Sequence, residues 1–201
     1  MALAVSDMRI CDKITPAYLA SNLALLQNAQ VIVCDTNSPQ ESLIYLAENC
    51  DVPIFCDPVS TVKAEKIRPI LGRLHTLKPN RLEAELLSGV KIETTEDVYK
   101  AADKLLEMGV HRMFISMGGD GILAAMGDEK LLLPNIPGNM VNTTGCGDAA
   151  MAAITWAYLE GTDLRNTTLA ALAAGSIAME SVETINPEMS AEALKNRIQK
   201  A

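Results

Sequence analysis

The chain has 201 residues, 49% of them hydrophobic, which is enough to bury one sizeable core and predicts a single domain over residues 1–201. Its formal net charge of -8 argues against nucleic acid as a partner, because phosphate backbones attract clustered lysine and arginine. No apolar run in the sequence is long enough to cross a bilayer, so no membrane partner is expected. The five cysteines form no CxxC pair, which favours the free thiols of a cytoplasmic protein over a zinc site.

Taken in chain order, short β-type runs alternate with helical segments, which is typical of parallel strands joined by crossover helices. The pattern predicts an α/β fold with a mostly parallel, Rossmann-type sheet flanked by helices. The expected strands are residues 31–35, 53–57, 75–78 and 112–117, with residues 2–5 as a strand already in progress. The expected helices are residues 15–28, one that opens at residues 38–41, and then residues 62–71, 80–88 and 95–108.

Local signals define the first of these elements. Thr15 is placed to cap the first helix. Ser38 and Glu41 indicate a capping box that has Pro39 at the first helical position. The strand at residues 31–35 is apolar enough to be buried.

The second half of the chain adds two further elements. Residues 122–126 and 130–133 predict a hairpin appended to the parallel sheet. Residues 149–159 predict a helix that is apolar nearly all round, which suits a helix buried in the core.

The most informative stretch is residues 142–148, Asn-Thr-Thr-Gly-Cys-Gly-Asp, just before the apolar helix. Gly145 and Gly147 let the backbone approach a ligand, and free N–H groups at a helix start bind anions. Asp148 then lies in the first helical turn, where its carboxylate could accept the proton of an attacking hydroxyl group. On spacing alone, a tight glycine loop followed by an aspartate that favours the helix dipole explains the stretch equally well.

Two further motifs follow expected strands. In residues 78–83, Asn80 and Glu83 face the same side of one helical turn, a spacing that suits a hydrated magnesium ion. Taken alone, an N-cap asparagine with a glutamate in the first turn is the simpler interpretation. Residues 116–121, Ser-Met-Gly-Gly-Asp-Gly, are by themselves only a turn that enters a hairpin.

Residues 142–148 closely resemble the C-terminal signature of the ribokinase-like (PfkB) carbohydrate kinase family, and the other two motifs occur in that family's order. The resemblance implies that ATP and Mg²⁺ are used and that Asp148 is the catalytic base. The residues that it assigns to the anion hole are Gly145, Cys146 and Gly147. The residues that it assigns to nucleotide or magnesium binding are Asn80, Glu83, Ser116, Gly118, Gly119, Gly121 and Thr144.

The resemblance has two departures and two weaker implications. Cys146 stands where alanine is usual, which is tolerated if only its N–H is used. Asn142 stands where the family often has the aspartate of a monovalent cation site, which weakens any claim to such a site here. Residues 170–179 are expected to supply apolar contacts to adenine. Lys63 is either a charge near the phosphates or, as we prefer, an ordinary solvated lysine.

Several runs resemble the pseudouridine kinases of this family more than its ribokinases or fructokinases. These runs are residues 4–8, 57–64, 75–85 and 116–121. The resemblance implies phosphorylation of the primary hydroxyl of the pseudouridine ribose. The alternatives are a kinase for another sugar or nucleoside, and a non-catalytic ATP-binding fragment.

Family members carry their sugar-binding motifs and a β-strand lid in the N-terminal part, and this chain resembles the C-terminal part. Without a lid, water would reach the phosphoryl group, so kinase activity of the chain alone is expected to be weak or absent. Missing first strands would also leave a sheet edge and apolar surface uncovered, which predicts self-association into a homo-oligomer.

Overall fold

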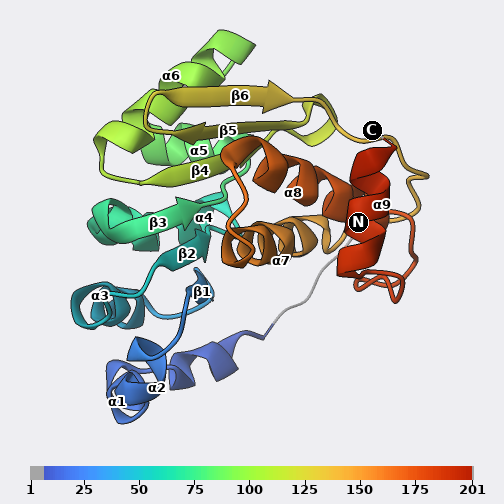
Figure 1. Ribbon diagram of the computed structural model, residues 1–201. Coiled ribbons are helices and arrows are strands. Elements are labelled where there is room, and N and C mark those ends of the chain that lie inside the picture. Colours follow the sequence, from blue (N-terminus) through green and yellow to red (C-terminus); the bar gives the residue numbers. More distant parts are fainter. Residues whose placement is uncertain (1–6, 201) are drawn as a thin grey trace.

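The structure is a computed structural model that describes residues 7–200, and the strand expected at residues 2–5 lies outside the described residues. At its centre is a six-stranded sheet whose strands stand in chain order, β1 to β6 (Figure 1). The strands are β1 (Ile32–Asp35), β2 (Ile54–Asp57), β3 (Leu74–Leu77), β4 (Arg112–Ser116), β5 (Ile122–Met126) and β6 (Glu129–Leu133). As predicted, β1 to β4 are parallel, and β5 and β6 form an antiparallel hairpin beside β4.

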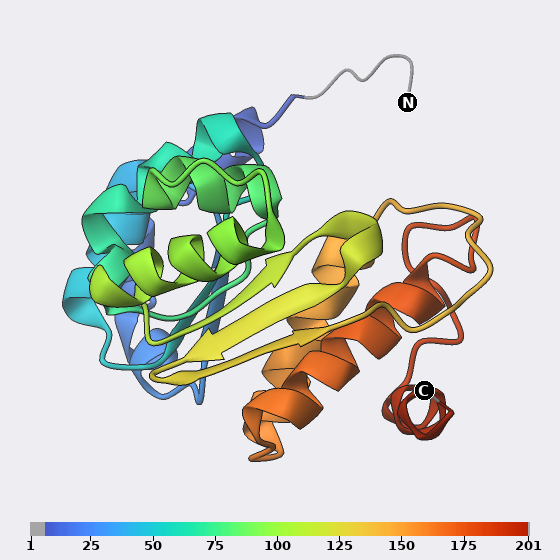
Figure 2. The ribbon, with the colours of Figure 1, turned by 90° about the horizontal axis from the view of Figure 1, so that it is seen from above.

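Helices cover both faces of this sheet (Figure 2). Because β1 to β4 are neighbours in chain order and such crossovers are right-handed, the helices that connect them fall on one face. These connecting helices are α3 (Gln40–Asn49), α4 (Thr61–Ala64), a 3-10 helix (Glu65–Arg73), α5 (Arg81–Ser88) and α6 (Thr95–Glu107). The helices that follow the hairpin are α7 (Cys146–Leu159) and α8 (Leu164–Ala178), which cover the opposite face, and α9 (Ala191–Gln199), which packs against α8.

The alternation of side chains along the strands divides the core into two layers. In β4, Phe114 packs with α7 and α8, whereas Met113 and Ile115 pack with the connecting helices, and all three are fully buried. In β2, Phe55 and Ile54 divide between the two layers in the same way. A shift of one residue would exchange the two layers, so packing fixes the register and with it the loops at the carboxyl ends of the strands.

The helix expected at residues 15–28 is divided into α1 (Pro16–Ser21) and α2 (Leu23–Gln27), after a 3-10 helix (Arg9–Lys13). Thr15 caps α1 as predicted, since its hydroxyl oxygen accepts a hydrogen bond from the Tyr18 backbone N–H at 3.2 Å. The break falls at Asn22, whose side-chain amide donates to the Tyr18 carbonyl at 2.8 Å. Asparagine competes in this way with the backbone for its hydrogen bonds, which apolar spacing does not reveal.

Two other expectations near β1 are wrong. α3 has Pro39 as its N-cap and no side-chain cap, so the capping box expected from Ser38 and Glu41 does not form. Pro39 has an extended backbone, with ψ of 146°, which leaves Ser38 one residue too far from the helix. Within the described part of the chain, residues 7–200, β1 lies at the edge of the sheet rather than inside it, and Val33 is 50% exposed.

The apolar helix expected at residues 149–159 is α7, which begins earlier, at Cys146. One side of α7 packs in the core, but Trp156 and Leu159 line an open groove, and Leu159 is 48% exposed. The expectation of a helix buried all round is therefore wrong. None of the described helices is long and apolar enough to cross a membrane.

Candidate active site

α7 begins at a turn that glycine makes without strain. Gly145 is its N-cap with φ of 87°, and a Cβ atom at this position would overlap the Thr184 carbonyl oxygen. Such a helix start has backbone N–H groups without partners inside the helix, and it carries partial positive charge. An anion is the natural ligand of this turn.

The amides predicted to form the anion hole are not equally free. The Cys146 N–H donates to the Thr143 carbonyl at 3.3 Å. Within residues 7–200, no hydrogen bond engages the N–H of Gly145 or Gly147. The amides available to a ligand at this turn are therefore those of the two glycines rather than that of Cys146.

Asn142 and Thr144 hold the loop before the turn. The Thr144 N–H donates to the Asn142 side-chain oxygen at 3.0 Å, and the Asn142 side-chain amide donates to the Val182 carbonyl at 3.3 Å. The second bond joins the loop to the segment after α8. An aspartate at position 142 could not donate it, so asparagine makes a direct contact here that a carboxylate cannot.

A cavity of about 360 Å³ opens beside the α7 start, and we call it the nucleotide cavity. Residues predicted from two separate motifs line it together: Ser116, Gly118, Gly119, Gly121, Cys146 and Gly147. The end of β4 supplies Ser116, and the turn after it, which includes a 3-10 helix (Gly118–Asp120), supplies the three glycines, Gly118, Gly119 and Gly121. From the expected adenine-binding segment, Ala171, Leu172 and Met179 form an apolar wall. A cavity with an apolar wall and exposed backbone suits a nucleotide.

A wider groove of about 810 Å³ lies between α7 and β1, and we call it the acceptor groove. Asp148 lines this groove, whereas its neighbour Gly147 lines the nucleotide cavity. The first turn of α7 therefore separates the two spaces. Asp148 is exposed, so its carboxylate is accessible to a ligand.

Asn80 and Glu83 form a capping box at the start of α5. The Asn80 side-chain oxygen accepts from the Glu83 N–H at 2.9 Å, and a Glu83 carboxylate oxygen accepts from the Asn80 N–H at 2.8 Å. Glu83 is 2% exposed, and burial, with the nearby charge of Asp57, raises the pKa of its carboxyl group. The Ser116 N–H donates to the Pro79 carbonyl at 2.9 Å, which brings the second and third motifs side by side.

Lys78 and Asp57 belong to this site, although the sequence motifs did not single them out. Lys78 Nζ lies 2.7 Å from Asp57 Oδ2, and the two side chains are 6% and 15% exposed. Lys78 lines the nucleotide cavity and Asp57 lines the acceptor groove. Asp57 ends β2 and Lys78 directly follows β3, its parallel neighbour. That placement at the carboxyl edge of an α/β sheet is the signal by which the sequence could have indicated them.

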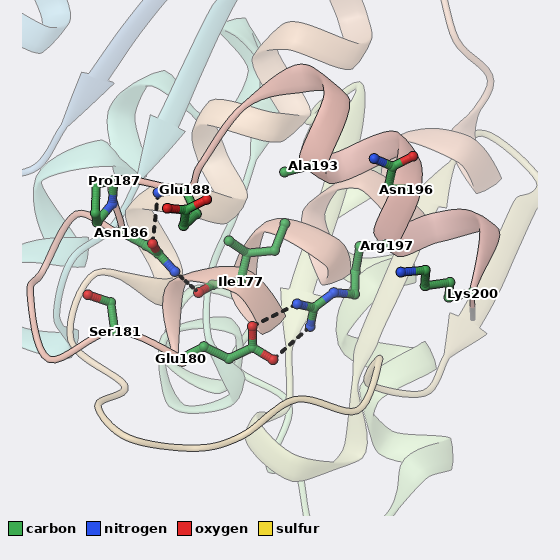
Figure 3. A pocket seen from close by; sticks show the side chains of 10 residues that line it. All are labelled: Ile177, Glu180, Ser181, Asn186, Pro187, Glu188, Ala193, Asn196, Arg197 and Lys200. Carbon is green, nitrogen blue, oxygen red and sulfur yellow. Dashed lines mark hydrogen bonds and ion pairs between the residues drawn. The ribbon is translucent and has the colours of Figure 1, made fainter.

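A third cavity, of about 510 Å³, lies between α9 and the end of α8 (Figure 3). Arg197 of α9 forms a two-point ion pair with Glu180, at 2.7 and 3.0 Å, and donates to the Ser176 hydroxyl oxygen at 2.6 Å. Ser176 in turn donates to the Pro137 carbonyl at 3.1 Å. These bonds fix the loop after β6, part of which lines the nucleotide cavity.

Known proteins of similar sequence and fold include several kinases. Residues 10–191 match the family described as pfkB family carbohydrate kinase. The chain is 40% identical over 193 residues to the pseudouridine kinase of Escherichia coli, covering 94% of this chain and 61% of that protein. The crystal structure of a putative sugar kinase from Clostridium perfringens matches with a TM-score of 0.91 and 29% identity, over 100% of this chain and 64% of that one.

A putative ribokinase II from E. coli, solved in complex with ATP and Mg²⁺, shares the fold with a TM-score of 0.81 at 18% identity, over 94% of this chain and 64% of that one. The chain thus spans between 61% and 64% of the length of these three relatives. The sequence match nonetheless covers the three motifs that the fold gathers around the α7 turn. On the match over residues 10–191, the chain belongs to the pfkB family of carbohydrate kinases.

Proposed function

We propose that this chain carries the ATP site and the proton acceptor of a kinase that phosphorylates the primary hydroxyl of a ribosyl substrate in the cytoplasm. The observation that supports this most directly is that the α7 start has Gly147 on the nucleotide cavity and Asp148 on the acceptor groove. A phosphoryl group at this turn would lie between ATP, the phosphoryl donor, in the nucleotide cavity and the substrate hydroxyl, the phosphoryl acceptor, in the acceptor groove. Pseudouridine is the proposed substrate, supported by the 40% identity to the E. coli enzyme.

Each residue of the turn has a role in the proposed transfer. The hydroxyl oxygen of the acceptor forms a bond to the γ-phosphorus of ATP, and Asp148 accepts the proton that this hydroxyl loses. The bond from that phosphorus to the β–γ bridging oxygen breaks, and the electron pair leaves with ADP. The N–H groups of Gly145 and Gly147, with the α7 dipole, stabilise the negative charge on the transferring group.

The side chains near the start of α5 fit a magnesium ion. Mg²⁺ takes oxygen ligands and keeps several of its waters. Glu83 and Asp57 offer carboxylate oxygens, and burial first, then the nearby charge of Asp57, raises the pKa of Glu83. When bound, Mg²⁺ neutralises phosphate charge. We assign Glu83, positioned by Asn80, as the residue that holds it.

Asp148→Asn tests the proposal. The chain is incubated with MgATP and pseudouridine, uridine, ribose or fructose, and both ADP and phosphorylated product are measured. We expect weak product formation from pseudouridine, since this chain alone is expected to have little kinase activity, and a further loss of roughly 100-fold or more in Asp148→Asn, because asparagine keeps the shape but cannot accept the proton. The dissociation constant for ATP should be unchanged. Asp163→Asn is the matched control: Asp163 caps α8 by accepting from the Asn166 N–H at 2.7 Å, and asparagine caps equally well.

The outcomes separate the alternatives. Equal product formation by wild type and Asp148→Asn would place the base elsewhere. Product from another sugar or nucleoside, and not from pseudouridine, would change the substrate and keep the reaction. ADP release without product would mean that water accepts the phosphoryl group, as an exposed Asp148 allows. ATP binding without ADP release would favour a non-catalytic nucleotide-binding protein.

A further inference from the structure

Lys78 holds a buried positive charge where the nucleotide cavity meets the acceptor groove. The residue is 5% exposed, and its backbone N–H donates to the Cys56 carbonyl at 3.1 Å, so strand pairing fixes its position. Its ammonium nitrogen lies 2.7 Å from Asp57 Oδ2. Asp57 is fixed in turn, because its other oxygen accepts from the Val59 N–H at 3.1 Å.

The same ammonium group lies beside the start of α7. A Cβ atom built on Gly147 would lie 3.5 Å from Lys78 Nζ, so an anion that bonds the Gly147 N–H is within reach of the lysine. Lys78 and Gly147 line the nucleotide cavity, whereas Asp57 and Asp148 line the acceptor groove. The Lys78–Asp57 pair therefore lies across the boundary between the nucleotide cavity and the acceptor groove, as the first turn of α7 does.

A purely structural role, in which Lys78 only neutralises the charge of Asp57, does not explain why Lys78 is buried. Burying an ion pair is costly, and apolar residues of similar volume are often at least as stable in its place. A lysine ammonium has three N–H donors, and for Lys78 the described chain supplies Asp57 as the acceptor. Lys66, by contrast, donates to the Thr36 and Ser38 carbonyls, at 2.9 and 3.0 Å, and has an evident role in holding that loop.

We propose that Lys78 is a catalytic residue that contacts the transferring phosphoryl group, and that Asp57 positions it; this rests on the proposed function. As the bond to the bridging oxygen breaks and the bond to the acceptor oxygen forms, the three other oxygens of the group carry negative charge. The Lys78 ammonium stabilises that charge from the sheet, as the Gly147 N–H does from α7. Lys78 keeps its protons throughout, and the hydroxyl proton goes to Asp148.

ATP and ADP differ by the group that Lys78 would contact, so their dissociation constants test the proposal without any acceptor. We expect Lys78→Met to weaken ATP binding about tenfold or more and ADP binding less than about twofold, measured by calorimetry. Lys63→Met is the matched control, because the Lys63 ammonium donates to the Asn37 side chain and both constants should be unchanged. Equal weakening of ATP and ADP, or no weakening of either, would overturn the proposal.

Lys78→Met leaves Asp57 without its partner in a half-buried place, which can prevent folding. The double variant Lys78→Met with Asp57→Asn removes both charges, and thermal unfolding checks that it folds. We expect it to lose the preference for ATP over ADP as fully as Lys78→Met. A folded double variant that keeps the wild-type preference would refute the assignment of Lys78.

Asp57→Asn isolates the positioning role. We expect it to reduce the preference for ATP over ADP while Lys78 is present and to add nothing once Lys78 is methionine, a coupling that a purely structural Asp57 would not produce. Additive effects would refute the positioning role. Failure of the proposed function is a different result: there, Asp148→Asn leaves product formation unchanged, whatever Lys78→Met does to nucleotide binding.

Discussion

Glu83 is a buried carboxylate with one observed role, in capping α5, and one proposed role, in holding Mg²⁺. One of its oxygens accepts the Asn80 backbone N–H at 2.8 Å, and this bond needs an oxygen acceptor rather than a negative charge. Holding Mg²⁺, by contrast, needs the charge. Glutamine offers the acceptor without the charge, so one substitution distinguishes the capping role from the proposed role in metal binding.

We therefore expect Glu83→Gln to raise the Mg²⁺ concentration for half-maximal activity about tenfold or more, while the melting temperature changes little. Titration of activity with Mg²⁺ at saturating ATP measures the first, and thermal unfolding the second. Glu85→Gln is the control, because Glu85 lies on the same helix and also accepts a backbone N–H, that of Ile92, at 2.8 Å. A similar Mg²⁺ requirement in both variants would exclude Glu83 as the metal-holding residue.

Single residues of the site differ in how far the sequence predicts them. Gly145 and Asp148 lie within one short motif, where glycine spacing and a helix start already define a local geometry. Asn80 and Glu83 also form a local motif, and the simpler interpretation of a helix cap is confirmed as far as hydrogen bonds are concerned. Lys78 and its partner come from different strands, so their contact depends on sheet register, which no local pattern contains.

Among the elements, α9 has the clearest link to the site. Arg197 contacts Glu180, after α8, and Ser176, on α8, and Ser176 donates to the Pro137 carbonyl in the loop after β6. The Arg197 side chain is 24% exposed and that of Glu180 is 29% exposed, so the pair is partly shielded from solvent. A helix far from the motifs along the chain therefore positions a wall of the nucleotide cavity.

Arg197→Met should release this loop. We expect the ATP dissociation constant to rise roughly fivefold, which corresponds to about 1 kcal/mol, and the melting temperature to fall by a few degrees. Lys200→Met is the control, since it removes the same charge from the same cavity (Figure 3). Calorimetry and thermal unfolding measure the two effects. A lower melting temperature with unchanged ATP affinity would show that α9 stabilises the fold without positioning the nucleotide cavity.

The sequence predicted the type of each element, helix or strand, better than it predicted which elements are buried. The parallel strands and the hairpin follow from runs of β-type residues, because each buried strand must be apolar along its own length. Whether a strand lies at an edge is a property of its neighbours, which is why β1 was wrongly expected to be buried. For the same reason the apolar α7 was expected in the core, although one side of it lines the acceptor groove.

At the scale of the whole molecule, the two ends of the sheet differ in chemistry. Two of the motifs lie at the carboxyl ends of β3 and β4, whereas an aromatic and cationic cluster lies near the amino ends of β2 to β4. The His75 and Phe55 rings stack at 5.3 Å, and Arg112 lies over the Phe114 and Tyr158 rings at 5.2 and 5.3 Å. Burial lowers the pKa of Arg112 to about 10, and its buried Nη2 has no hydrogen-bond partner among residues 7–200.

His75 makes the stability of the fold depend on pH. Burial first, and then the charges of Arg112 and His111, lower the pKa of His75 from 6.5 to about 4. Between these values the unfolded chain binds a proton that the folded chain does not, so the free energy of unfolding falls as pH is lowered from about 6.5 to about 4. The slope from one such proton is at most about 1.4 kcal/mol per pH unit.

His75→Phe isolates this contribution, because phenylalanine can keep the stacking on Phe55 and cannot bind a proton. Denaturant unfolding at several pH values between 4 and 6.5 should give a shallower loss of stability for His75→Phe than for wild type. His111→Gln, which changes the exposed histidine of the pair, should keep most of the wild-type slope. If His75→Phe and wild type lose stability in parallel, carboxylates elsewhere carry the acid sensitivity, and the cluster contributes packing alone.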